Sequence, residues 1–394
     1  MTAVVLVAIM VDRRAITFRT LAIAAMIVLL LTPEALVHPS FQMSFAATLG
    51  LVALVQIGMP NLFATPESSR TARAALWGGR EIAMLALASL IAGLATTPYA
   101  AFHFHRFTPY GVLANLAAMP VVSILVMPAG ILGLVAMPFG FDGIFWRVMD
   151  FGIVWMIAVA QWVAALPGAI GRIAAFGIGP LITASGGIIL LGLLRTPLRF
   201  AGAGLLAVAM LAALRTPQPD VLISGDGRSV GVRGQDGVLN VMSAGKDAFV
   251  LREWLGADAD ARVAGDASLG HGVSCDADGC VTALADGALV ALALTSEALP
   301  DDCQRAAIVV SARPVPADCA ALAIGPQALR ARGAMMIRRQ GDAYVIEAQR
   351  PRGTDRPWSP AVAEADDVAA PTSGAAPARP ADATPAETDL QADD

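Results

Sequence analysis

Eight apolar stretches fill the first 214 residues of the chain and are separated by short polar connections. They lie at residues 1–11, 21–37, 41–58, 81–101, 111–137, 144–166, 176–194 and 199–214. A helix of about 20 apolar residues crosses the roughly 30 Å of hydrocarbon in a bilayer. The first stretch is too short to cross, so the pattern predicts a polytopic α-helical membrane protein with about seven spans and a partial one.

The long stretch at 111–137 contains Pro120 and Pro128, so we expect a tilted, kinked or broken helix there. A proline frees a main-chain carbonyl, and broken helices in membranes tend to line cavities. Asn115 in this stretch is therefore a candidate for a transport pathway. An ordinary structural break explains the same pattern equally well.

After residue 215 the pattern changes to short β-like runs separated by Asp-Gly turns and two helix-like pieces. The runs begin near Val221, Val230, Val238, Ala288 and Ile308. We expect a membrane domain at 1–215, a small α+β domain at 216–350 and a disordered tail at 351–394. The tail is rich in Ala, Pro and acidic residues, and it has too few large apolar residues to offset chain entropy.

Charge divides the chain in the same place. Up to Arg215 there are twelve arginines, no lysine and six acidic residues, a net charge of +6, whereas the remainder has 15 basic and 26 acidic residues, a net charge of −11. Arginines gather in alternate connections, at Arg13, Arg14, Arg19, Arg70, Arg73, Arg80, Arg195 and Arg199. The positive-inside rule makes these connections cytoplasmic. Residues 216–394 then lie on the opposite face, which is the periplasm in a Gram-negative bacterium.

All four cysteines lie in the polar half, at Cys275, Cys280, Cys303 and Cys319. Disulfide bonds persist in the periplasm, so the cysteines agree with the predicted orientation. Four cysteines allow three pairings, and their spacing does not choose among them. Disulfides and unpaired thiols both remain open, while the spacing does not favour a zinc site.

Several separated motifs in residues 1–215 resemble the membrane core of ComEC-type competence proteins. The first motif is Pro33-Glu34-Ala35-Leu36 followed by Pro39-Ser40-Phe41-Gln42-Met43-Ser44-Phe45-Ala46-Ala47. The second is His103-Phe104-His105-Arg106-Phe107-Thr108-Pro109-Tyr110-Gly111 followed by Leu113-Ala114-Asn115-Leu116-Ala117-Ala118-Met119-Pro120. The loop Asp12-Arg13-Arg14-Ala15 precedes both.

The resemblance implies an inner-membrane channel that carries one strand of transforming DNA into the cytoplasm. Its partners would be single-stranded DNA, the lipid bilayer and other competence proteins. Complete members usually carry an N-terminal OB-like domain that is missing here, so Met1 reads as an internal start of a split, truncated or misannotated gene. A split gene would encode the N-terminal part separately. The alternative is a truncated, non-conducting membrane remnant or scaffold. The sequence indicates no oligomeric state.

Polar residues within the motifs are candidates for the transport pathway. Ser40 and Ser44 share one helix face, and Gln42 adds an amide, so we expect them to face the bundle interior. They either line a pore or form hydrogen bonds between packed helices. His103, His105 and Arg106 combine with neighbouring aromatic rings. This loop is either a mouth that binds DNA or an interfacial anchor.

The α+β domain has the position of a metallo-β-lactamase-like domain, which many members of the family carry. That chemistry needs a His-x-His-x-Asp-His cluster to hold two metal ions. Here His271 is the single histidine of the domain. The sequence therefore predicts no metal, no cofactor and no nuclease activity.

Overall fold

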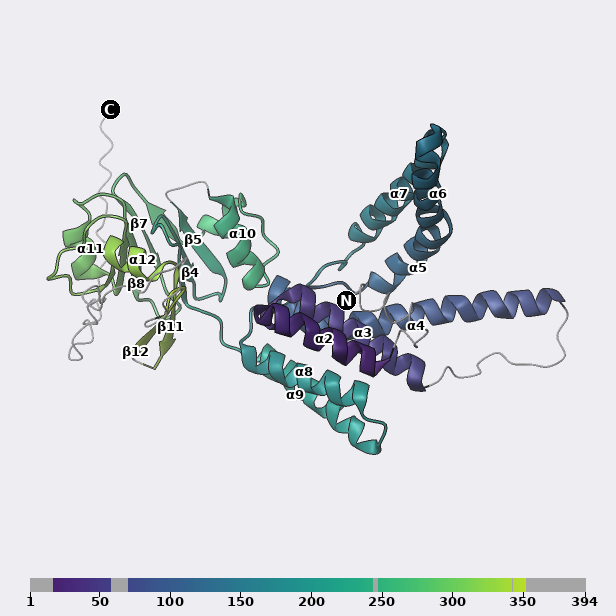
Figure 1. Cartoon of the computed structure of the whole chain (residues 1–394). Helices are drawn as coiled ribbons and strands as arrows, with labels where there is room; N and C mark the ends of the chain where they lie inside the picture. The colour runs from purple at the N-terminus through teal and green to yellow at the C-terminus, as the bar shows by residue number, and fades with distance from the viewer. Residues whose placement is uncertain (1–16, 58–69, 244–246, 342, 352–394) are drawn as a thin grey trace, which may run out of the picture. The chain divides into compact units, whose positions relative to one another are not determined.

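A computed structural model describes residues 17–57, 70–243, 247–341 and 343–351 (Figure 1). The chain forms two compact units, Met1–Gln218 with Gly256–Ala261, and Pro219–Leu255 with Arg262–Asp394. Each unit is described by itself. The first apolar stretch at 1–11, the arginines Arg13 and Arg14, and the tail after Pro351 lie outside the described residues.

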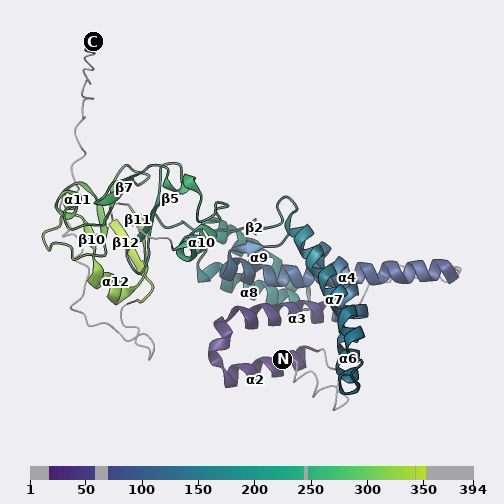
Figure 2. The same cartoon turned by 90° about the horizontal axis from the view of Figure 1, so that it is seen from above.

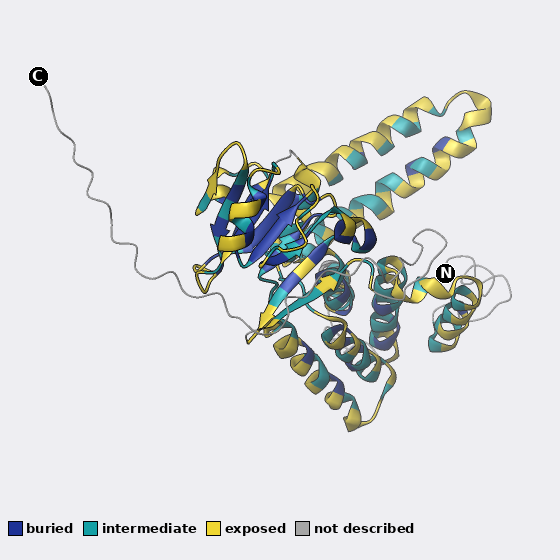
Figure 3. Ribbon diagram, turned by 90° about the vertical axis from the view of Figure 1, so that its left-hand side faces the viewer, coloured by how far each residue is buried: buried dark blue, intermediate teal, exposed yellow. Residues whose placement is uncertain are grey.

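The first unit is helical. Its helices are α2 (Phe18–Leu31), α3 (Pro39–Ile57), α4 (Arg70–Phe104), α5 (Gly111–Val121), α6 (Met127–Ala136), α7 (Gly143–Ala164), α8 (Ile178–Leu193) and α9 (Phe200–Leu214). Helices α2 and α3 form one hairpin, and α8 and α9 lie side by side in another (Figures 1 and 2). Much of the helical surface is exposed and apolar, as suits helices that face lipid (Figure 3).

Four described helical segments are long and apolar enough to cross a membrane, namely Gly78–Phe104, Gly111–Phe139, Gly143–Ala164 and Pro197–Leu214. The seven spans expected from the sequence are therefore not supported. Helices α2 and α8 have only 14 and 16 residues. At 1.5 Å per residue they are about 21 and 24 Å long, which is short of the hydrocarbon thickness.

The ends of α2 explain why the expected stretch at 21–37 is too long. Helix α2 begins after Thr17, whose hydroxyl accepts a hydrogen bond from the N–H of Thr20. It stops at Thr32, and Pro33 opens a separate 3-10 turn, η1 (Pro33–Val37). Helix α3 has 19 residues, but Ser40, Gln42 and Ser44 make its first half less apolar than its second. Apolar composition predicted the helices but not where they stop.

The proline-containing stretch at 111–137 is continuous but irregular. A π-helical segment, η2 (Val122–Val126), joins α5 to α6, and Pro120 and Pro128 lie on either side of it. A 3-10 turn, η3 (Met137–Phe139), completes the segment. Because Pro120 and Pro128 each lack an N–H, the wider π-helical pairing occurs where the regular α-helical ladder is interrupted.

The core of the first unit joins helices that are far apart in the sequence. Ala46 of α3, Ala95 and Tyr99 of α4, and Leu181 and Ile188 of α8 are buried together. Two glycines bring α8 and α9 into contact along their backbones. A Cβ at Gly202 would lie 2.6 Å from the carbonyl oxygen of Gly187, and a Cβ at Gly187 would lie 2.8 Å from that of Gly202. Small residues permit such close helix packing in membranes.

The second unit contains two five-stranded sheets. One has the order β12-β11-β3-β4-β5 and is antiparallel throughout. Its strands are β3 (Val221–Ile223), β4 (Ser229–Arg233), β5 (Leu239–Ser243), β11 (Met335–Gln340) and β12 (Ala343–Ala348). The other has the order β10-β9-β8-β7-β6, in which β8, β9 and β10 are parallel. Its strands are β6 (Val273–Cys275), β7 (Gly279–Ala283), β8 (Leu289–Ala293), β9 (Ile308–Ser311) and β10 (Leu322–Ile324).

The two sheets enclose one apolar core, and helices cover their outer faces. The shared core includes Val230, Met242, Leu292, Ile308 and Ile337, all fully buried. Helix α10 (Ala248–Ala257) covers the outer face of the sheet that contains β5, and α11 (Leu299–Arg305) covers that of the sheet that contains β8. A short helix, α12 (Pro326–Arg332), contributes to the shared core. The strands are the most buried part of the unit (Figure 3).

We expect Gly202→Ala to lower the stability of the helical unit by about 1–3 kcal/mol, because the new methyl group would collide with the α8 backbone. Gly204→Ala is the matched control, since a Cβ there meets nothing within 4 Å. Thermal unfolding of the two detergent-solubilised variants measures the difference. Equal stability of the variants would contradict the close helix contact.

Candidate functional site

Gln42 and His103, one from each family-like motif, form a hydrogen bond in the structure. Gln42 lies in the first turn of α3 and His103 in the last turn of α4, and the distance from His103 Nε2 to Gln42 Oε1 is 2.8 Å. The amide nitrogen of Gln42 donates to the carbonyl oxygen of Leu36 at 2.9 Å. The amide oxygen is therefore the acceptor for His103, which assigns the proton on Nε2 to the histidine.

Further contacts join the segments that connect the helices at the end where Gln42 and His103 lie. Phe102 packs edge-on against Phe176, with ring centroids 5.7 Å apart, and Ile173 N–H donates to His105 O at 3.1 Å. Gln218, just beyond α9, donates to Ala175 O at 3.1 Å. The ends of α3 and α8 that lie away from His103 are also joined, because Arg195 donates to Gln56 Oε1 at 2.6 Å.

His105 and Arg106 belong to a small β clasp. Strand β1 (Arg106–Phe107) pairs antiparallel with β2 (Gly171–Arg172), so that Arg106 lies opposite Arg172 and Phe107 opposite Gly171. Both arginines are exposed. Like charges directly opposite each other disfavour pairing, so an anion bound between them would relieve their repulsion. The sequence analysis did not single out Arg172, because a two-residue strand has no periodicity to reveal it.

Ser40 and Ser44 do not join Gln42 on the side of α3 that meets α4. Both are exposed, and both line an open hollow of about 390 Å³ between η1 and the start of α3. Glu34 and His38 line the same hollow, as do Val28, Ala35, Phe41 and Phe45. The rings of Phe41 and Phe45 are 4.3 Å apart. The hollow is therefore amphipathic, with apolar walls and a polar rim.

Asn115 lies on α5 with an exposed side chain, and it makes no hydrogen bond with a described residue. The structure does not bring it together with Gln42 and His103. A buried contact that the sequence analysis missed joins α4 to α8 instead. The hydroxyl of Tyr99 donates to Ser185 Oγ at 3.0 Å, and Ser185 donates to Leu181 O at 2.8 Å.

The second unit holds all four cysteines in two disulfide bonds, a pairing that the sequence left open. Cys275–Cys280 joins β6 to β7, where the two residues face each other in the sheet register. Cys303–Cys319 joins α11 to the segment before β10. In the ranges that the structure describes, no group of three His, Cys, Asp or Glu side chains could hold a metal ion. His271 is exposed.

We expect Gly171→Ala to disrupt the β clasp, because a Cβ at this position would lie 2.1 Å from the ring of Phe107. Phe107→Ala removes the ring. The double variant Gly171→Ala/Phe107→Ala should therefore be about as stable as Phe107→Ala alone. Gly177→Ala is the control, since its Cβ meets nothing within 4 Å. Thermal unfolding in detergent provides the measurement, and additive losses in the double variant would rule out this contact.

Comparison with known proteins identifies the helical unit. The model of a family described as Competence protein matches residues 1–198, which is half of the 394-residue chain. No curated protein matches the chain. No solved structure matches it either. The matched region contains both motifs, the Gln42–His103 hydrogen bond and the β clasp, and the chain belongs to the competence protein family.

Proposed function

We propose that this chain carries single-stranded DNA across the bacterial inner membrane during natural transformation, as a ComEC-like protein. Membership of the competence family supports a role in DNA uptake. The observation that carries the finer proposal is the hydrogen bond between Gln42 and His103, since it unites the two motifs at one end of the helices.

The chemistry at that end suits a single strand. Single-stranded nucleic acid binds by stacking its bases on aromatic rings, worth about 1–3 kcal/mol per base, while basic groups follow the phosphates. Phe107 supplies a ring between Arg106 in β1 and Arg172 across the β clasp, and both arginines are exposed. Phe102 and Phe176 add partly buried rings that pack edge-on against each other and against the helical core. The strand would enter at the β clasp and pass the Gln42–His103 pair. The open hollow lined by Ser40 and Ser44 would offer the strand a second surface beside α3.

The same contacts support a proposed orientation across the membrane. We infer that the end with the β clasp faces the periplasm and that the end with Arg195 faces the cytoplasm, where basic residues are enriched. Gln218 joins the clasp end, so the second unit begins on the periplasmic side. Two disulfides in that unit agree with an oxidising compartment. Other competence proteins would supply the DNA and the driving force.

We also propose that the second unit is a remnant of a metallo-β-lactamase-like domain and that it does not cleave DNA. Its place after the helices and its paired sheets support the first part. The absence of DNA cleavage is supported by the histidine content of the unit. His271 is its single histidine, and one histidine cannot supply the ligands that two metal ions require. Another protein would then degrade the complementary strand.

Deleting the gene should abolish entry of labelled DNA into the cytoplasm, and the wild-type gene should restore it. Gln42→Leu and His103→Leu should each reduce uptake, because an interhelical hydrogen bond in a membrane contributes about 1–2 kcal/mol. Losing this energy lowers the population of the arrangement in which α3 and α4 are joined by roughly 5–30-fold. Fluorescent DNA protected from external nuclease is the readout, with the membrane level of each variant measured in parallel.

Gln161→Leu is the matched control for Gln42→Leu, since Gln161 is an exposed glutamine of α7. It should leave uptake unchanged. Normal transformation in the deletion strain would refute the transport proposal and favour a non-conducting remnant or scaffold.

An alkaline phosphatase fused after Gln218 should be active, because the enzyme folds only where its disulfides form. A fusion after Thr196, in the connection between α8 and α9, should be inactive. Phosphatase activity in whole cells measures both. An inactive first fusion with an active second one would reverse the orientation.

A further inference from the structure

The turn between β3 and β4 lies at an edge of the second unit where four segments meet. Gly227 in this turn has a φ of +67°, a conformation that favours glycine. A Cβ at Gly227 would lie 2.5 Å from Leu329 of α12 and 3.7 Å from the main-chain nitrogen of Ala312. A Cβ at Gly225 would lie 3.4 Å from the nitrogen of Ala334. The turn therefore touches the end of β9, α12 and the start of β11.

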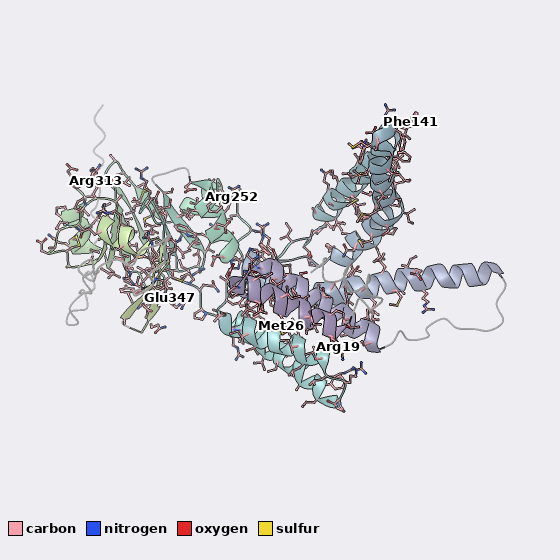
Figure 4. All side chains as sticks on the ribbon, in the orientation of Figure 1. Arg19, Met26, Phe141, Arg252, Arg313 and Glu347 are labelled. Carbon is pink, nitrogen blue, oxygen red and sulfur yellow. A yellow bond between two sulfur atoms is a disulfide. The ribbon has the colours of Figure 1, made fainter. Side chains whose placement is uncertain are left out.

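The turn, the end of β9 and α12 each carry an arginine beside the contact. Arg228 follows Gly227, Arg313 follows Ala312, and Arg330 follows Leu329. Arg332 precedes the Gly333–Ala334 contact, and its carbonyl oxygen accepts a hydrogen bond from Arg350 N–H at 3.0 Å. We call this set the arginine edge; it comprises Arg228, Arg313, Arg330, Arg332 and Arg350. Arg228, Arg313 and Arg330 are exposed, and Arg313 lies at the surface of the unit (Figure 4).

Three members of the arginine edge lack the ion pairs that other arginines of the unit form. Arg305, Arg338 and Arg339 form ion pairs with Asp301, Glu347 and Asp286. Arg330, Arg332 and Arg350 form no ion pair with any residue that the structure describes, and Arg313 Nε donates to the carbonyl oxygen of Leu294. This concentration of charge occurs in the half of the chain whose net charge is −11.

Asp226, the acid within the turn, is engaged by the turn itself. Burial raises the pKa of Asp226, but the Ser224 hydroxyl, the Arg228 N–H and the nearby Arg228 charge outweigh burial and lower it. Asp226 Oδ1 accepts from the Ser224 hydroxyl at 2.6 Å and from Arg228 N–H at 3.1 Å. These bonds order the turn and fix the backbone position of Arg228.

We propose that the arginine edge binds the phosphate backbone of single-stranded nucleic acid. Guanidinium groups match phosphate oxygens in geometry, and several of them along one edge can follow a polyanion. Among the large exposed apolar side chains of the described part of this unit, such as Phe249 and Val263, only Met336 belongs to the segments that form the edge. A surface that inserts into lipid needs such side chains. Without aromatic rings on these segments, binding is independent of base sequence.

This inference rests on the proposed transport of DNA, and it assigns to the second unit the capture of the strand. A surface that holds phosphates without reading bases accepts DNA of any sequence. It also holds the strand loosely, because contacts with phosphates are exchanged readily as the strand slides.

The test uses the full chain in neutral detergent and a fluorescent single-stranded oligonucleotide, with binding measured by fluorescence anisotropy at several salt concentrations. The variant R228Q/R313Q/R330Q should bind more weakly, and the slope of log K against log salt should fall by about 2, or roughly 0.7 for each lost phosphate contact. The control R252Q/R305Q/R339Q removes the same charge from exposed arginines elsewhere and should keep the wild-type slope. Circular dichroism and intact disulfides verify folding.

Three outcomes would overturn the proposal. They are equal weakening by both triple variants, an unchanged slope in the edge variant, and displacement of the oligonucleotide by phosphatidylglycerol micelles that depends on the same arginines. The last result would identify a lipid-binding surface. If the edge binds DNA as expected while the deletion strain takes up DNA normally, the transport proposal fails and the binding surface stands. If DNA uptake requires the gene but the arginines do not affect oligonucleotide binding, the transport proposal stands and the binding surface is refuted.

Discussion

Polar groups within an apolar helical unit need partners from the protein itself, because hydrocarbon offers none. This constraint explains three pairs of polar side chains that join α3, α4, α8 and the connection after α8. Gln42 meets His103 at one end, Tyr99 meets Ser185 in the interior, and Arg195 meets Gln56 at the other end. These pairs fix the relative positions of helices whose apolar surfaces alone would pack in many ways. The end that contains Gln42 also contains the β clasp.

Hydrophobic patterning predicted where the helices lie but not their ends. Pro33 and Thr32 end α2 after 14 residues, and no average over apolar residues detects that boundary. In the second unit the runs predicted near Val221, Val230, Val238, Ala288 and Ile308 correspond to β3, β4, β5, β8 and β9, whereas β6, β7, β10, β11 and β12 were missed. Two of the missed strands, β6 and β10, have only three residues each. Short strands carry too few residues to show a period, and their existence depends on the neighbours with which they pair.

Individual site residues were easier to predict than their partners. Resemblance to the family selected Gln42 and His103, but 61 residues separate them and only the folded helices show that they touch. The pairing of Cys275 with Cys280 follows from the register of β6 and β7, which the spacing of four cysteines does not contain. The arginine edge was missed for the same reason, because its members come from four separate segments of one fold.

The order of strands in the sheet β12-β11-β3-β4-β5 has a consequence for how the second unit is made. Strand β3 is the first of this unit to leave the ribosome, yet one of its two neighbours is β11, which begins at Met335. Until β11 has been synthesised, one edge of β3 stays open and could pair wrongly with another strand. The unit therefore completes its fold late, after nearly all of its chain is available, and such long-range closure is slow.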